Sequence, residues 1–119
     1  MTYKVLVVDD SQTTRMSIKN FLGGDYVVEE AENGQVALDI LSEDNNFDLI
    51  ILDINMPELD GMGFIHLQAE NERVKKIPTI LCTTEASVLM KDKAKATGVV
   101  KAWIVKPVTS KVLLHAVDR

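Results

Sequence analysis

Short uninterrupted runs of apolar residues recur along the chain at similar intervals. Four of them are rich in β-branched residues and end abruptly at a polar or charged residue; they cover 5–8, 49–52, 79–82 and 102–105. Their length and composition predict β-strands, and the lack of in-out alternation favours strands covered on both faces, as in a parallel sheet. A fifth segment, 27–31, contains Glu29 and Glu30 among its apolar residues and is predicted to be an edge strand.

Helical periodicity fills the intervals between these runs. Five helices are predicted. The first starts at residue 11 or 12 and ends at 22, and the others cover 33–43, 61–70, 86–97 and 109–117. Two of them carry one clear apolar face, formed by Val36, Ala37, Ile40 and Leu41 and by Val112, Leu113, Ala116 and Val117. Polar capping residues open the first helix, and Gly23-Gly24 and Gly98 are helix-stop signals. Five β–α pairs in strict alternation predict a doubly wound α/β fold with right-handed crossovers.

Composition narrows the class of protein further. The 119 residues predict one domain over 1–119, and 46% apolar with 26% charged residues is typical of a globular chain. A net charge of −5 disfavours direct nucleic-acid binding, and no apolar run approaches the ~20 residues of a membrane span. The first residues leave no room for a signal peptide, and the single Cys82 suits a reducing compartment. We therefore expect a cytoplasmic protein without membrane insertion.

Reactive side chains follow four of the five predicted strands. They are Asp9 and Asp10, Asp53, Thr83 and Thr84, and Lys106. In an open parallel sheet, ligands bind outside the carboxyl ends of the strands, so these groups are expected to converge. Three carboxylates at close range repel one another unless a cation intervenes, and oxygen ligands suit Mg²⁺. A carboxylate nucleophile beside a cation, a lysine and a threonine hydroxyl is a phosphoryl-binding site in outline. The plainer alternative is that these acids only cap helices or lie in solvated loops.

Five sequence blocks in this order resemble the receiver domain of two-component response regulators. The blocks are VLVVDDS, AENGQVAL, LDINMPELDG, TILCTTEA and WIVKP, and the likeness covers essentially the whole chain. It is similar in particular to stand-alone chemotaxis regulators of the CheY type. The resemblance implies a flavodoxin-like (βα)₅ fold whose five parallel strands have the order 2-1-3-4-5.

The resemblance also implies a role for each residue of the site. Asp53 is expected to be the phosphoacceptor, which takes a phosphoryl group from a sensor histidine kinase or a phosphotransfer protein. Asp10 and Asp53 would bind Mg²⁺ (or Mn²⁺) directly, Asp9 directly or through water, and Asn55 through its backbone carbonyl. No organic cofactor is implied, and the domain would catalyse only its own phosphorylation and dephosphorylation.

A conformational switch is implied as well. Lys106, aimed by a cis peptide bond to Pro107, would pair with Asp53 and later with the phosphoryl group. Thr83 would move toward that group and Trp103 would turn from an outward to an inward rotamer. The surface of the fourth helix, fifth strand and fifth helix would then change its affinity for a downstream protein, as a population shift.

Three positions carry separate expectations. Thr84 stands where the family usually has Ala or Gly, so we expect it to crowd the path of the water that attacks the acyl phosphate. Trp103 stands where the family usually has Tyr, Phe or His, so the rotamer switch depends on whether the inward pocket accepts its larger ring. Arg15 either matches a position that the family uses near the kinase interface or is simply an exposed arginine on a helix.

Other functions remain open from the residues alone. A phosphohydrolase of the haloacid-dehalogenase sort also uses an Asp nucleophile with Mg²⁺, but it needs a second acid where this chain has Asn55. A flavodoxin-type FMN carrier would need a glycine- and hydroxyl-rich phosphate loop in place of Asp9-Asp10. Cys82 is expected to be a core residue, and His66 and His115 surface residues, because no metal-ligand spacing surrounds them.

Overall fold

A computed structural model describes residues 3–44, 46–54, 61–84, 88–106 and 108–118. The strands are β1 (Tyr3–Val8), β2 (Tyr26–Ala31), β3 (Leu49–Asp53), β4 (Thr79–Thr83) and β5 (Val100–Val105). The helices are α1 (Gln12–Leu22), α2 (Gly34–Glu43), α3 (Gly61–Glu70), α4 (Val88–Ala96) and α5 (Ser110–Asp118). The predicted alternation of five strands and five helices is confirmed, with boundaries that shift by one or two residues at about half of the ends.

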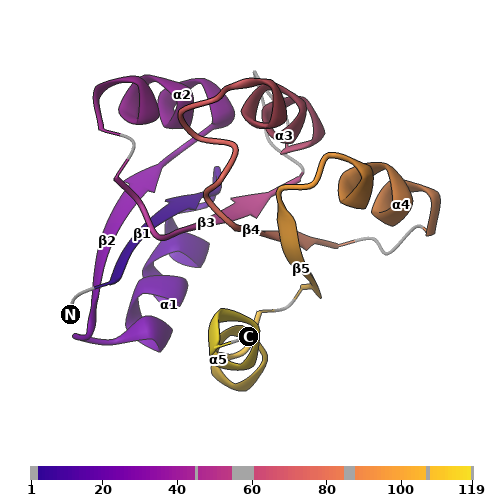
Figure 1. Cartoon of the computed structure of the whole chain (residues 1–119). Coiled ribbons are helices and arrows are strands. Elements are labelled where there is room, and N and C mark those ends of the chain that lie inside the picture. The colour runs from indigo at the N-terminus through magenta and orange to yellow at the C-terminus, as the bar shows by residue number, and fades with distance from the viewer. Residues whose placement is uncertain (1–2, 45, 55–60, 85–87, 107, 119) are drawn as a thin grey trace.

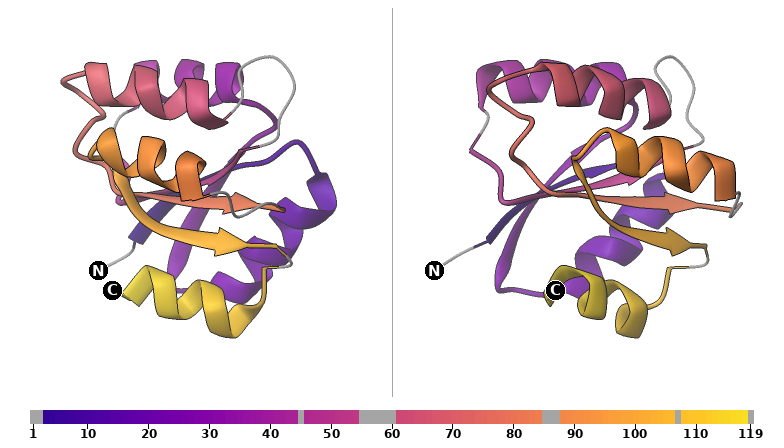
Figure 2. Two further views of the ribbon diagram at one scale, coloured as in Figure 1. Left: turned by 90° about the vertical axis from the view of Figure 1, so that its right-hand side faces the viewer. Right: turned by 45° about the vertical axis from the view of Figure 1, so that its right-hand side comes forward.

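The strands form one parallel sheet in the order β2-β1-β3-β4-β5. This is the strand order that the family resemblance implies, and it places β2 at an edge, as the charged residues within it predict. Figures 1 and 2 show α2, α3 and α4 on one face of the sheet and α1 and α5 on the other. The fold is therefore a three-layer, doubly wound α/β structure.

Each face of the sheet has its own apolar core. Leu6 and Ile50 belong to the core beneath α2, α3 and α4, and their chain neighbours Val7 and Ile51 belong to the core above α1 and α5. All four are at most 1% exposed. Successive side chains of a strand point to opposite faces, so an apolar run without alternation fills both cores at once.

The ends of the helices follow the capping signals of the sequence. Ser11 and Asn33 each accept a hydrogen bond from the backbone N–H three residues later, at 3.3 and 2.8 Å. Gly23 and Gly98, after α1 and α4, have φ angles of 78° and 80°, which glycine adopts without steric cost. Local chemistry thus sets where these helices begin and end.

Two predictions of burial are wrong. Val105 of β5 is 46% exposed, although its apolar run predicted a strand covered on both faces. β5 is the second edge strand, so it has a neighbour on one side only. Val112 of α5 is 47% exposed, whereas Leu113 and Ala116 are buried. The apolar stripe of α5 is therefore narrower than the sequence suggested, and Val112 lies outside it.

The predicted helix over 86–97 is observed as α4 from Val88 to Ala96, and its first two positions lie outside the described residues. Among the helices of the described segments, none has the length and apolar character to cross a bilayer. The reactive residues that follow β1, β3, β4 and β5 lie at the carboxyl-end rim of the sheet.

Candidate functional site

The sheet register brings two acids from distant parts of the chain together. β1 and β3 are neighbours, with Val8 paired to Leu52, so Asp9 and Asp53 come next on adjacent strands. Val7 and Ile51, two residues earlier in each strand, pack into the core of the α1–α5 face. Because strand side chains alternate, Asp9 and Asp53 both lean toward that same face.

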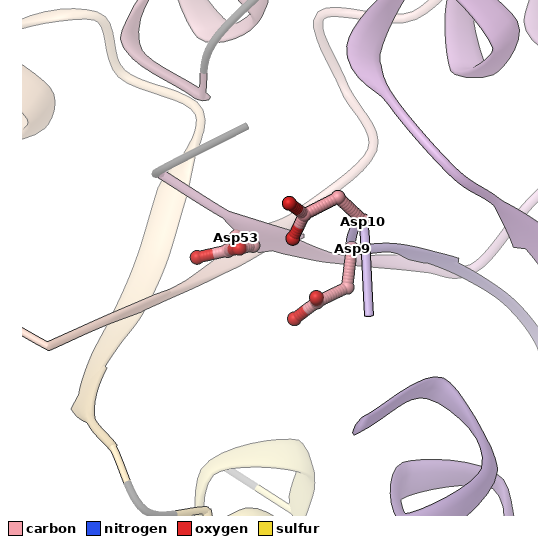
Figure 3. Close-up of side chains that lie close together, drawn as sticks. All are labelled: Asp9, Asp10 and Asp53. Carbon is pink, nitrogen blue, oxygen red and sulfur yellow. The ribbon is translucent and has the colours of Figure 1, made fainter. Parts of the chain in front are cut away.

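Three carboxylates form one cluster at this rim. Figure 3 shows Asp9, Asp10 and Asp53 side by side, and one carboxylate oxygen from each lies within 4.8 Å of the others. Asp9 and Asp53 are 2% and 4% exposed, while Asp10 is open to solvent. Like charges this close repel one another unless positive charge lies nearby.

Lys106 supplies one such charge. It follows β5, and its backbone N–H donates to the carbonyl oxygen of Thr83 at 2.7 Å. Its Nζ lies 3.1 Å from Oδ2 of Asp9 and 3.3 Å from Oδ1 of Asp53. Burial lowers the pKa of Lys106, but the charges of Asp9 and Asp53 and the hydrogen bonds to them raise it more, so the net shift is upward. The group therefore remains an ammonium at neutral pH.

The donor set fits a hard divalent cation. With all carboxylates ionised, three acids and one lysine leave a formal charge of −2, which one such cation would balance. All the candidate ligands are oxygens, the type that Mg²⁺ and Mn²⁺ accept. One oxygen of each acid lies within 4.8 Å of the others, close enough for a single cation to be held among the three. Asp9, Asp10 and Asp53 are the described residues that would hold it.

Arg15 contacts the cluster from α1. Its Nη1 donates to the backbone carbonyl oxygen of Asp9 at 2.6 Å, and its Nε pairs with Oε1 of Glu30 on β2 at 2.9 Å. The side chain is only 14% exposed, so the interpretation of Arg15 as a free surface arginine is wrong. No local pattern predicts these contacts, because in the sequence Glu30 is only a charged residue of an edge strand.

The predicted switch residues lie on the neighbouring strands. Thr83 is the last residue of β4 and is 1% exposed. Thr84 follows it, is exposed, and lines a cavity of about 490 Å³ together with Lys106 and residues of α1. Trp103 lies in β5 opposite Leu81, half-buried against the core of the α2–α4 face. It is therefore not part of the acidic cluster.

Two predicted features lie outside the described residues: the Asn55 carbonyl ligand and the peptide bond to Pro107. They stay predictions. Cys82 is 1% exposed, and burial raises the pKa of its thiol to about 12, which confirms a core residue. His66 and His115 are exposed, as expected.

Gly61 is a site residue whose importance the sequence did not reveal. Its N–H donates to the carbonyl oxygen of Ile54 at 2.9 Å. A Cβ at this position would lie 2.6 Å from Cα of Ile54 and 2.7 Å from the carbonyl oxygen of Asp53, closer than real contacts allow. From the sequence, Gly61 is only the residue at which a helix is predicted to start. The structure shows that α3 begins in direct backbone contact with the strand end that carries Asp53.

Comparisons with known proteins agree with this geometry. The family model described as "Response regulator receiver domain" matches residues 5–118. The chain is 36% identical over 118 residues to the chemotaxis protein CheY of Pseudomonas aeruginosa, covering 98% of this chain and 94% of that protein. It is 40% identical over 121 residues to the chemotaxis protein CheY1 of Helicobacter pylori, covering 97% and 94% respectively.

A solved structure is similar over the full length. The chemotaxis response regulator CheY4 of Vibrio cholerae superposes with a TM-score of 0.90 at 36% identity, covering 100% of this chain and 98% of the other. The strand order, the strand-end acids with their lysine, and these matches lead to one assignment. The chain belongs to the response regulator receiver domain family.

Proposed function

We propose that Asp53 accepts a phosphoryl group from the phosphohistidine of a sensor histidine kinase or phosphotransfer protein, in a Mg²⁺-dependent reaction. One observation carries the proposal: Nζ of Lys106 lies within 3.3 Å of carboxylate oxygens of both Asp9 and Asp53, inside a cluster of three acids. A site that only capped helices would not need a buried carboxylate pair, a lysine and a third acid at one point.

The reaction is a displacement at phosphorus. A carboxylate oxygen of Asp53 attacks, the bond from phosphorus to the donor nitrogen breaks, and its electron pair stays on the imidazole. Bound Mg²⁺ would neutralise charge on the phosphoryl oxygens during transfer. Release of phosphate follows when water attacks the phosphorus of the acyl phosphate and restores the Asp53 carboxylate.

Lys106 and Thr83 provide the remaining positive charge and hydrogen-bond donor. Lys106 already lies beside Asp53 and needs little movement to pair with an oxygen of the phosphoryl group. Thr83 ends the neighbouring strand β4, from which its hydroxyl can donate to a second oxygen. Both groups stabilise the negative charge of the phosphoryl oxygens, which is present only after Asp53 has been phosphorylated. They therefore favour the phosphorylated state.

The output surface we propose is the one formed by α4, β5 and α5. Val105 and Val112 are apolar residues of this surface that are about half exposed, at 46% and 47%, and so are free for a protein partner. The relatives of this chain in Pseudomonas aeruginosa and Helicobacter pylori are named chemotaxis proteins. We therefore propose a comparable signalling role in the cytoplasm for this chain. The net charge of −5 argues for a protein target rather than a nucleic acid.

Mass spectrometry after incubation with acetyl phosphate or a phosphoramidate tests the proposal. We expect the mass of one phosphoryl group to be added with Mg²⁺, and none with EDTA or in Asp53→Ala. Phosphorylation of Asp53→Ala at the wild-type rate would show that another residue is the acceptor.

The same samples test the two other functions that the sequence left open. Steady turnover of a phosphomonoester would support the phosphohydrolase, and a yellow protein with bound FMN would support the flavin carrier. The receiver family match favours neither of them. We expect no turnover and no flavin.

A further inference from the structure

Arg15 connects the cation site to two other parts of the fold. Through Nη1 it binds the backbone carbonyl of Asp9, and through Nε it binds Glu30, the last residue but one of β2. Its fork of donors can hold two acceptors in one fixed geometry, which a lysine ammonium cannot do. The arginine therefore ties α1, β2 and the end of β1 together at one point.

Asp9 is held at every polar position that it has. Its N–H donates to the carbonyl oxygen of Ala31 at 3.1 Å, Oδ1 accepts from the N–H of Ser11 at 2.8 Å, and Oδ2 contacts Lys106 at 3.1 Å. Arg15 holds the fourth position, the carbonyl oxygen, at 2.6 Å. That contact differs from the others because the carbonyl belongs to the peptide that joins Asp9 to Asp10.

The orientation of this peptide decides where Asp10 points. Asp10 is exposed and lies between β1 and α1, so no strand or helix bond of its own fixes its backbone. Rotation of the peptide plane would move the carboxylate of Asp10 away from Asp9 and Asp53. The burial of Asp9 and Asp53 does not prevent this movement, because Asp10 itself is exposed. The Arg15 contact restrains that rotation.

The positive charge of Arg15 is balanced by the neighbouring carboxylate of Glu30. A lone guanidinium beside three carboxylates would compete with a cation and repel it, but Glu30 pairs with Arg15 at 2.9 Å. The side chains are 14% and 33% exposed, so the pair is partly shielded from solvent. The effect of Arg15 on the acidic cluster is therefore mainly geometric.

We propose that Arg15 is a positioning residue of the divalent-cation site, that it acts by fixing the Asp9–Asp10 peptide, and that Glu30 holds it in place. The inference rests on the proposed function, since it concerns the same cation site. Residues that orient metal ligands typically change metal affinity about 10–100-fold when they are replaced. Arg15 acts through a peptide rather than on a ligand atom, so we expect the lower end of this range.

The experiment measures Mn²⁺ affinity of the full chain from the electron paramagnetic resonance signal of the free ion, with Mg²⁺ as competitor. We expect Arg15→Met to bind Mn²⁺ about 10-fold more weakly than the wild type. Lys19→Met is the matched control: it removes the same charge from an exposed position of the same helix. Its affinity should stay within about twofold of the wild type, because exposed charges are screened.

Glu30→Gln and the double variant test the second half of the proposal. Glu30→Gln leaves Arg15 without its counter-charge and should weaken Mn²⁺ binding less than Arg15→Met does. The double variant should be no weaker than Arg15→Met alone, since both changes act through one contact. If the fold-losses of Mn²⁺ affinity in the two single variants multiply in the double variant, Glu30 acts independently of Arg15. That result would overturn the role assigned to Glu30.

Urea unfolding in EDTA separates positioning from folding. A purely structural Arg15 would lower the free energy of unfolding and leave the Mn²⁺ affinity of the folded protein unchanged, which would overturn the inference. If Arg15→Met does not fold, Arg15→Lys replaces it and is expected to lose affinity as well, because an ammonium cannot reproduce the fixed spacing of the Nη1 and Nε donors. Wild-type protein that binds no Mn²⁺ or Mg²⁺ would instead overturn the proposed function, and this inference with it.

Discussion

At the scale of single residues, Lys106 shows how two opposing effects decide a charge. Burial favours the neutral amine, and the neighbouring Asp9 and Asp53 favour the ammonium. The carboxylates prevail, and the pKa of Lys106 lies above its ordinary value. The order of the sequence predicted which residue types follow the strands, but only the contacts at 3.1 and 3.3 Å show that one lysine serves two acids.

Thr84 leads to a prediction about phosphate release. Its exposed side chain lines the cavity beside Lys106, whose Nζ lies 3.3 Å from Oδ1 of Asp53, so we expect water to approach a phosphorylated Asp53 from this side. Replacing Thr84 by Ala should open this path, and we expect the phosphoryl group to be lost about 3–10-fold faster, or ~0.6–1.4 kcal/mol of barrier. The measurement is the rate of inorganic phosphate release after the donor is removed.

Thr84→Val is the control, because valine keeps the branched shape and removes the hydroxyl. It should release phosphate as slowly as the wild type. Fast release from Thr84→Val would mean that the hydroxyl group matters, and equal rates for wild type and Thr84→Ala would disprove the crowding argument.

At the scale of elements, the contact between α3 and the end of β3 sets the position of Asp53. The cap at Ser11 and the stops at Gly23 and Gly98 could be predicted because each depends on bonds within a few residues. The demand for glycine at 61 could not, since it comes from the backbone of Ile54 after α3 has packed against it. The wrong prediction for Val112 has a similar cause. Helical periodicity shows that α5 has an apolar face, but not how wide the buried part of that face is.

Gly61→Ala tests this contact. A methyl group 2.6 Å from Cα of Ile54 forces the backbone to move, so we expect a loss of about 1–3 kcal/mol in the free energy of unfolding. The shift should also slow phosphorylation, because the displaced backbone carries Asp53. Urea unfolding and the rate of phosphorylation by acetyl phosphate measure the two effects.

Gly24→Ala provides the comparison, since nothing lies within 4 Å of a Cβ at position 24. It should leave phosphorylation unchanged and the protein as stable as the wild type or slightly more so. If Gly61→Ala behaves in the same way, the close contact does not constrain β3.

At the scale of the whole molecule, the sheet separates Asp53, the proposed phosphoacceptor, from Trp103, the residue that is expected to report on it. Asp9, Asp53 and Lys106 lean toward the α1–α5 face, whereas Trp103 packs on the side of α4. Nε1 of Trp103 is buried and finds no hydrogen-bond partner within the described parts of the chain. Nζ of Lys91 on α4 lies 5.8 Å from its ring centroid. A buried donor without an acceptor costs free energy, which favours a second position for this ring.

Trp103 is the single tryptophan of the chain, so its fluorescence reports on this position alone. We expect the emission to change when Mg²⁺ and beryllium fluoride, a phosphoryl analogue, are added together, and neither alone to be enough. Asp53→Ala should show no change. An unaltered spectrum in the wild type, with the analogue shown to be bound, would mean that Trp103 does not take part in the switch.

The sequence by itself determined the five β–α pairs, most helix ends and the identity of the residues at the strand ends, because these follow from patterns within a few residues. Only the tertiary structure decided which of them meet. The contacts of Lys106 with Asp9 and Asp53 join segments far apart in the chain, and those of Arg15 with the Asp9 carbonyl and Glu30 and of Gly61 with β3 join different helices and strands. Their distances depend on strand order, on the face to which each side chain points, and on how closely the helices pack, none of which a local pattern contains.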